Sequence, residues 1–245
     1  MRCKPIAMRV PDIVASCGGI DQLSVGIYAS KDESEPVELL IHDEIGETWY
    51  GEGVSASSVV TFLNQHKSRD VNVSINSPGG LVYDGLVIYN RLAEHSGNVS
   101  VTIEGLAYSA ASFIAMAGDT IRMHQASDFG IHRAMGVAFG NAKAAESLRD
   151  WLTTIDGHLV DMYVARTGQD PDQIETWMDG VDDGTLFSAA EALEHGFADE
   201  VIPLKTKTEK KDKLDANVIN NAHTMASQYA RQQFLSRRRK NGLTR

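Results

Sequence analysis

The sequence predicts an α/β domain in which the strands pair largely in parallel. Apolar and β-branched residues dominate three short runs, at residues 37–45, 71–76 and 98–104, and they alternate with polar residues in the last two. The intervening segments, residues 56–66 and 83–95, instead place apolar residues at the spacing of a helix. Strands that alternate with helices in this order indicate parallel strands joined by helical crossovers.

The second half of the domain adds one long helix and two short ones. Residues 142–167 repeat apolar side chains at helical spacing, and Gly168 ends this pattern. Pro171 is placed to open a short helix, because proline is favoured at the first helical position. Ser188 and Gly196 then bound the last helix as its cap and its terminator, before a final strand in FADEVI.

These elements predict one core domain over residues 36–203, flanked by two segments of different composition. The chain has 245 residues, of which 42% are hydrophobic, which suffices for one substantial core. Residues 1–35 are weakly patterned, with one short strand predicted in LSVGIYA. Residues 204–245 begin with a charged run and continue with a segment whose apolar helical face is thin. We expect this tail to be conditionally ordered.

Charge is distributed unevenly along the chain. The net charge is −10, yet residues 205–245 hold eleven Lys or Arg and three Asp or Glu, a local balance of +8. The remaining residues therefore carry −18, which argues against nucleic acid binding by the body of the domain. The basic tail suits an acidic partner, nucleic acid or the acidic body itself.

Composition and motifs exclude several classes of protein. No run approaches the roughly 18 apolar residues of a membrane span, and Arg9, Pro11 and Asp12 interrupt any signal-peptide core. Only Cys3 and Cys17 are present, so we expect no disulfide framework and a reducing cytoplasm. CxxC, HExxH and Walker motifs are absent from the sequence. We therefore expect no metal site, no cofactor and no membrane partner.

The strongest candidate for chemistry is Ser109, within the octapeptide GLAYSAAS at residues 105–112. A strand that passes through Gly105 into a small apolar helix lifts the Ser109 hydroxyl clear of the sheet. The free amides at the start of that helix can also meet an anion. On this octapeptide alone, small residues chosen for tight packing are the plainer interpretation. That interpretation also fits Ser112, one helical turn further on.

Two further stretches favour a catalytic role. SPGG, at residues 77–80, follows a strand, and consecutive glycines allow backbone amides to approach a ligand closely. IHRA places His132 at the end of a short strand, 23 residues after Ser109, where it is the obvious general base for an exposed serine. DGVDDGT, at residues 179–185, offers carboxylates that can hold an imidazolium, although Asp residues in such loops usually form turns.

Taken in order, these motifs resemble the Clp protease proteolytic subunit, and more closely the Clp-like head-maturation (prohead) proteases of tailed phages. The resemblance implies a ClpP/crotonase-like spiral of ββα units with a long handle helix, a serine protease activity and ring oligomers. It covers about residues 37–202, and the motifs that carry it are INSPGG (75–80), YDGLVIYNRL (83–92), GLAYSAASFIAMAGD (105–119), IHRAMGVAFGNA (131–142), ARTG (165–168) and FSAAEALEHGFADEV (187–201).

The resemblance assigns roles to four residues by position. Ser109 corresponds to the nucleophile and His132 to the general base. The backbone amides of Gly80 and Ala110 correspond to the oxyanion hole, in which two N–H groups stabilise the charge that develops on the attacked carbonyl oxygen.

The third member of the triad departs from the family pattern. The acid normally lies at the position that Gly184 occupies here. Asp183 is the nearest substitute and Asp182 the next, so three alternatives stay open: Asp183, Asp182 or a Ser-His dyad.

The expected function is that of a serine endopeptidase that processes phage capsid or scaffold proteins in head maturation. It would act as a homo-oligomeric ring in the bacterial host cytoplasm or inside the procapsid, and the sequence does not require a separate ATPase. Three alternatives remain: a non-catalytic capsid-assembly protein on the same fold, a crotonase-like acyl-CoA enzyme, and a host-type housekeeping protease. The pair of Ser109 and His132 argues against the first two.

Overall fold

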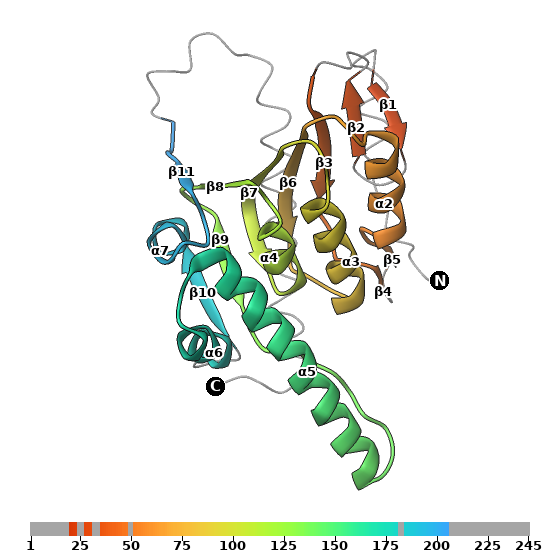
Figure 1. The fold of residues 1–245 in the computed structure, drawn as a ribbon, viewed down its shortest axis with the longest axis vertical. Helices are drawn as coiled ribbons and strands as arrows, with labels where there is room; N and C mark the ends of the chain where they lie inside the picture. Colours follow the sequence, from red (N-terminus) through yellow and green to blue (C-terminus); the bar gives the residue numbers. More distant parts are fainter. Residues whose placement is uncertain (1–19, 24–26, 31–34, 49–50, 181–183, 206–245) are drawn as a thin grey trace, which may run out of the picture.

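A sheet dominated by parallel pairs forms the centre of the computed structural model (Figure 1), as the sequence predicts. The residues that the structure describes are 20–23, 27–30, 35–48, 51–180 and 184–205. Nine strands within them join in the order β1-β2-β3-β6-β7-β8-β11, with β9 beside β7 and β10 beside β9. Their bounds are β1 Ile20–Leu23, β2 Ile27–Ser30, β3 Val37–Ile41, β6 Val71–Ser77, β7 Val99–Tyr108, β8 Thr120–His124, β9 Asp128–Ile131, β10 Thr185–Ser188 and β11 Glu200–Ile202. A separate antiparallel ribbon joins β4 (Glu47–Thr48) and β5 (Gly51–Glu52).

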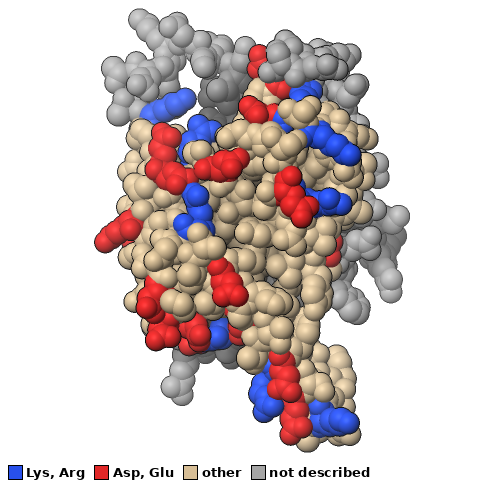
Figure 2. Space-filling model, in the orientation of Figure 1, with Lys and Arg blue, Asp and Glu red and all other residues tan. Residues whose placement is uncertain are grey.

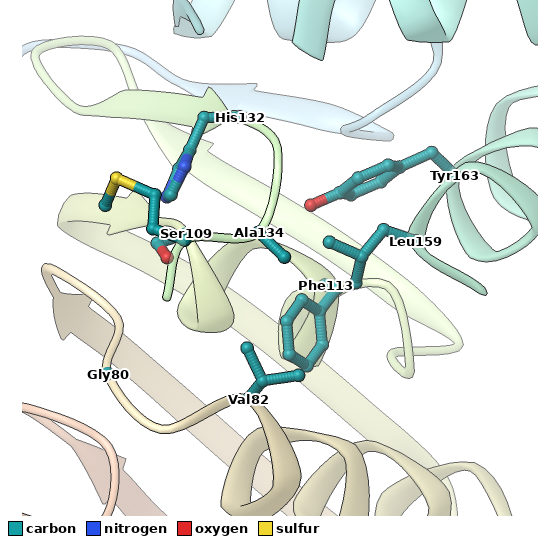
Figure 3. A pocket seen from close by; sticks show the side chains of 9 residues that line it. Gly80, Val82, Ser109, Phe113, His132, Ala134, Leu159 and Tyr163 are labelled. Atoms are coloured by element: carbon teal, nitrogen blue, oxygen red, sulfur yellow. The ribbon is translucent and has the colours of Figure 1, made fainter. Parts of the chain in front are cut away.

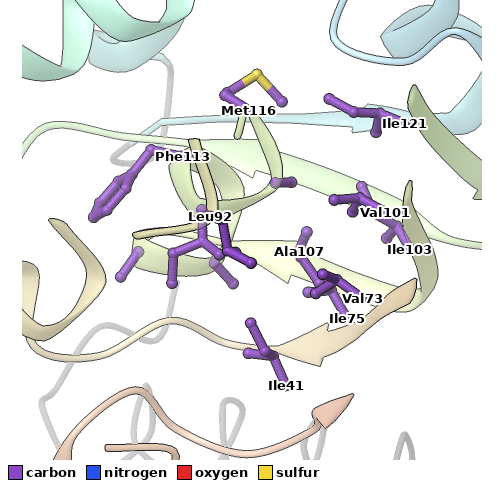
Figure 4. Packing of buried hydrophobic residues seen from close by; sticks show 14 of the residues in the cluster. Ile41, Val73, Ile75, Leu92, Val101, Ile103, Ala107, Phe113, Met116 and Ile121 are labelled. Carbon is purple, nitrogen blue, oxygen red and sulfur yellow. The ribbon is translucent and has the colours of Figure 1, made fainter. Parts of the chain in front are cut away.

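One face of the sheet is apolar because every second residue of its central strands points to that face. Three helices cover it, α2 (Ala56–Gln65), α3 (Val82–Ala93) and α4 (Ala110–Ala115). Burying one aliphatic side chain stabilises a fold by about 1.5–3 kcal/mol, so this layer is the main source of stability. Figure 4 shows part of it, and its strand residues are Val37, Leu39, Ile41, Val71, Val73, Ile75, Val99, Val101 and Ile103, each at most 1% exposed.

The central strand β7 changes its neighbour part way along its length. Residues 100–103 pair with β8, whereas residues 106–108 pair with β9, in both cases in parallel. The carboxyl end of β7 therefore lies beside β9, with Tyr108 opposite Gly130. This register brings Ser109, the residue after β7, close to the segment that follows β9.

Helix α5 is the long helix that the sequence predicts, and it spans Ala142–Thr167. The Asn141 side chain caps its first turn by accepting the Ala144 N–H, and Gly168 ends it in the left-handed conformation. The helix projects away from the sheet (Figure 1). Its buried residues all lie in the second half, at Ile155, Asp156, Leu159, Val160 and Tyr163.

The last elements pack beside β9. Helices α6 (Pro171–Asp179) and α7 (Ala189–His195) form where Pro171 and Ser188 predict them, and Ser188 makes a capping box with Glu191. Strand β10 lies between them, antiparallel to β9, and the sequence pattern does not predict it. Only one of its four residues, Phe187, is buried, which is too little for a periodic signal.

The structure differs from the sequence predictions at several elements. Other predictions concern residues that the structure does not describe. Strand β7 is longer than predicted, because it continues past residue 104 to Tyr108, and helix α4 is short, because it ends at Ala115. The strand expected in LSVGIYA is replaced by β1 and β2, which are antiparallel. The predictions for both cysteines and for residues 206–245 fall outside the part of the chain that the structure describes. None of the described helices has the length and apolarity needed to cross a membrane.

Candidate active site

Ser109 stands at the sharp turn between β7 and α4, the place predicted for a nucleophile. Its backbone has φ 59° and ψ −126°, and it is the only described residue other than glycine with a positive φ. Its N–H donates to the Gly130 carbonyl at 3.1 Å. Its carbonyl accepts two bonds from Ser112, from the N–H at 2.9 Å and from the hydroxyl at 2.6 Å. Both backbone groups of this strained residue are thus held in place.

Ser112 is packed, as the plainer interpretation of the sequence expects. Its side chain is fully buried, and besides bonding Ser109 its hydroxyl lies 2.7 Å from the Tyr163 hydroxyl. A hydroxyl engaged on both sides and shielded from solvent is not placed to attack a substrate.

His132 follows β9 directly and faces the same pocket as Ser109. His132 is 7% exposed, and its imidazole stacks on the Tyr108 ring with a centroid distance of 4.9 Å and an angle of 17° between the planes. Figure 3 shows this imidazole extending toward Ser109. The pairing of β7 with β9 explains the proximity, since Tyr108 and Gly130 are partners and each candidate residue lies just beyond its strand.

The SPGG loop borders the pocket on the opposite side. The Ile45 N–H donates to the Gly79 carbonyl and the Leu81 N–H donates to the Ile45 carbonyl, each at 2.9 Å. Gly80 lies between these bonds, in a parallel bridge to Ile45, so its own N–H is directed away from Ile45. Gly80 lines the pocket that contains Ser109 and His132.

Only glycine fits at positions 79 and 80, because other atoms of the protein lie very close to their Cα atoms. A Cβ on Gly79 would lie 2.5 Å from the Cβ of Ser109, and a Cβ on Gly80 would lie 2.2 Å from the Ile45 oxygen. Ser77, which the sequence analysis did not single out, holds this loop in place through two hydrogen bonds. Its hydroxyl donates to the Asp43 carbonyl at 2.6 Å and accepts the Gly79 N–H at 3.1 Å.

The second predicted amide belongs to Ala110, the first residue of α4. The opening amides of a helix lack intrahelical acceptors, and the Ser109 side chain makes no capping bond to them. Of the two predicted donors, Gly80 therefore lines the pocket and Ala110 follows Ser109 directly in the chain. Such donors can stabilise an oxyanion.

The pocket itself is small and mostly apolar. Its volume is about 90 Å³. Figure 3 shows that the side chains that line it come from several helices and strands and from the loops between them. A pocket of this kind beside a nucleophile suits an apolar side chain of a substrate. The residues that line it besides Gly80, Ser109 and His132 are Val82, Phe113, Ala134, Met135, Leu159 and Tyr163.

Gly184 lies against His132, and no side chain would fit there. It has φ +121°, and a Cβ at this position would lie 2.5 Å from the His132 Cβ and 2.4 Å from the Ile131 oxygen. Gly184 also forms a bridge with Gly180. The two carboxylates that the sequence offers as the third member, Asp182 and Asp183, lie outside the described residues.

The protein thus has an α/β fold with a pocket that Gly80, Ser109 and His132 line together. A family model described as Clp protease matches residues 37–205. The chain belongs to the Clp protease family.

Similar proteins agree with this assignment. The chain is 31% identical over 151 residues to ATP-dependent Clp protease proteolytic subunit 1 of Salinibacter ruber, a match that covers 61% of this chain but only 64% of that protein. It is 32% identical over 161 residues to proteolytic subunit 2 of Parasynechococcus marenigrum, covering 62% and 80%. Among solved structures, a mutant of ClpP1 from Listeria monocytogenes superposes with a TM-score of 0.59 at 23% identity, over 71% of this chain and 94% of that one. The last similarity establishes the ClpP-like fold that the sequence predicts.

Proposed function

We propose that this protein is a serine endopeptidase of the Clp type, with Ser109 as nucleophile and His132 as general base. The observation that carries the proposal is that Ser109, His132 and Gly80 line one pocket. Chemically, His132 takes the hydroxyl proton as Ser109 Oγ attacks the peptide carbonyl. The amides of Gly80 and Ala110 stabilise the oxyanion, and losing one such donor typically costs about 3 kcal/mol of transition-state stabilisation.

The rest of the cycle follows from the same groups. His132, now protonated, gives its proton to the leaving amine, which releases the first product and leaves an acyl group on Ser109. The imidazole then activates water to hydrolyse this ester, and the serine is regenerated. We further propose that Asp183 orients the imidazole. Support comes from Gly184, because this neighbour of Asp183 in the chain lies against His132.

The proposed substrate is a capsid or scaffold protein of a tailed phage, and the proposed working form is a ring. Support for the phage branch comes from the resemblance of the ordered motif series over about residues 37–202. A second candidate is an ATP-dependent subunit, since the named relatives are subunits of ATP-dependent Clp proteases. Cleavage of capsid precursors without ATPase favours the first candidate, and cleavage of folded proteins only with an added Clp ATPase favours the second.

Fluorophosphonate labelling followed by peptide mapping tests the activity. We expect the label on Ser109, and we expect Ser109→Ala to abolish both labelling and cleavage while leaving assembly intact. Ser127→Ala is the matched control, because Ser127 is a buried serine whose hydroxyl donates to the His124 carbonyl at 2.8 Å. Label that persists in Ser109→Ala and maps to Ser112 would show that the nucleophile is misassigned. An unlabelled wild type would favour a non-catalytic assembly protein.

A further inference from the structure

Helix α5 presents two buried polar side chains, Asp156 and Tyr163, to two different parts of the candidate site. As whole residues, the two are 8% and 1% exposed. A separation of seven residues is about two helical turns, so both lie on the same face of α5. This is the face of the helix that packs against the rest of the domain, whereas the adjacent Gly157 and His158 are exposed.

Tyr163 connects to the nucleophile through one intermediate hydroxyl. The Ser112 hydroxyl donates to the Ser109 carbonyl at 2.6 Å, and the Tyr163 hydroxyl lies 2.7 Å from the Ser112 oxygen. A serine hydroxyl has a single proton, so Tyr163 is the donor in the second bond. Burial raises the pKa of the Tyr163 phenol, which therefore remains protonated and remains a donor across the working pH range.

This chain of hydroxyls ends on the residue whose backbone is strained. Ser109 keeps its positive φ only while the surrounding bonds hold it. The Ser112 hydroxyl supplies one of the two bonds to the Ser109 carbonyl, and Tyr163 fixes the direction in which that hydroxyl donates. The orientation of the nucleophile thus depends on a side chain of α5.

Asp156 holds the segment that carries the general base. One carboxylate oxygen accepts the Ala134 N–H at 2.7 Å, and the other lies 3.5 Å from the Arg133 guanidinium. Arg133 and Ala134 are the two residues that follow His132. Arg133 also pairs with Glu175 at 3.0 Å and Asp179 at 2.5 Å on α6.

We propose that Asp156 and Tyr163 are positioning residues, Tyr163 for the Ser109 nucleophile and Asp156 for the His132 base. The inference rests on the proposed peptidase function and adds to it that one helix sets the relation between nucleophile and base. Neither residue needs to contact the substrate in this role. Displacing a reacting group by about 1 Å can cost about 100-fold in rate, so small changes in these bonds have measurable effects.

Tyr163→Phe tests whether Tyr163 positions the Ser109 nucleophile, because this substitution removes only the hydroxyl. We expect the rate constant of fluorophosphonate labelling and kcat for a short peptide to fall about 10-fold or more, with KM nearly unchanged. Tyr83→Phe is the matched control, because the Tyr83 hydroxyl also bonds α5, accepting the Trp151 Nε1–H at 2.7 Å, but it does not line the pocket. This control should keep the wild-type rate.

Asp156→Ala and Asp156→Asn together test whether Asp156 positions the His132 base. The alanine variant loses the acceptor for the Ala134 N–H and should label about 10-fold or more slowly. The asparagine variant keeps an oxygen acceptor in the same place and should recover most of the rate. Asp161→Ala controls for removing an acidic side chain from the same helix, and since Asp161 is exposed the rate should not change.

The measurement separates positioning from a loss of folded protein. A variant that merely unfolds in part lowers the amplitude of labelling, whereas a misplaced nucleophile or base lowers the rate constant of the molecules that do react. Wild-type rate constants in Tyr163→Phe and Asp156→Ala, with wild-type label on Ser109, would refute the positioning role and leave the peptidase proposal intact. Equal slowing in Asp156→Ala and Asp156→Asn would refute the role of the Ala134 bond. Label absent from wild-type Ser109 would instead defeat the proposed function itself.

Discussion

At the scale of single residues, the proposed nucleophile Ser109 has a backbone conformation that disfavours its own side chain. A residue other than glycine in such a conformation costs of the order of 1–3 kcal/mol. The structure holds it there through bonds to Gly130 and Ser112. The side chain that would do the chemistry therefore stands at a site where glycine would be more stable.

This strain leads to a testable difference between two inactive variants. Ser109→Ala keeps a Cβ at φ 59° and keeps the strain, whereas Ser109→Gly relieves it at the expense of a more flexible unfolded chain. The balance should make the glycine variant more stable by about 1 kcal/mol in the free energy of unfolding. Denaturant titration of both proteins measures this difference. A glycine variant less stable than the alanine variant would mean that the elbow is not strained.

A second prediction at this scale concerns the third catalytic group. A carboxylate bonded to one nitrogen of His132 fixes the tautomer and leaves the other nitrogen to accept the serine proton. Asp183→Asn should therefore lower kcat by orders of magnitude, since loss of this role in a triad can cost about 10⁴. Asp182→Asn should change kcat little. The reverse result would move the role to Asp182, and two nearly normal variants would indicate a dyad.

At the scale of elements, the sequence predicts most where local patterns decide the structure. The bounds of α5 could be predicted because Gly168 ends a long apolar repeat, and the positions of Ser109 and His132 follow from local motifs. The network behind them could not be predicted. Asp156 bonds a residue 22 positions away, and Tyr163 bonds Ser112 51 positions away. Such contacts depend on how α5 packs, and no short-range pattern encodes that packing.

Helix α5 also contains a glycine that its packing does not require. Gly157 is exposed in the middle of the helix, and a Cβ there would meet nothing within 4 Å. Gly157→Ala should therefore stabilise the protein by about 0.5–1 kcal/mol, because alanine favours the helix and restricts the unfolded chain. Thermal and denaturant unfolding measure the gain, and the labelling rate should remain at the wild-type value. A loss of stability would show that this surface of α5 is covered in the assembled protein.

At the scale of the whole molecule, the distribution of charge and of exposed apolar groups suits an assembly. The face shown in Figure 2 carries acidic side chains beside α6, where Asp172, Glu175 and Asp179 are exposed, and both signs of charge near the tip of α5. Residues 133–141 precede α5 in the chain and run alongside it between the pocket and that tip. Gly136 lies close to Leu148. This segment presents apolar side chains to solvent, which a protein acting alone has little reason to do.

The most exposed of these side chains are Met135, Val137 and Phe139, at 71%, 76% and 92%. The three lie at alternate positions of segment 133–141 and are largely exposed, and we expect a second copy of the chain to cover them. Sedimentation of the purified protein should accordingly show a large closed oligomer.

Phe139→Ser should shift the population toward smaller species, since burying a phenylalanine contributes up to about 3 kcal/mol per contact, which is roughly 100-fold in a dissociation constant. Val87→Ser, at a 42% exposed apolar position on α3 outside segment 133–141, should leave the oligomer intact. A wild-type protein that sediments as a monomer at micromolar concentration would rule out the ring.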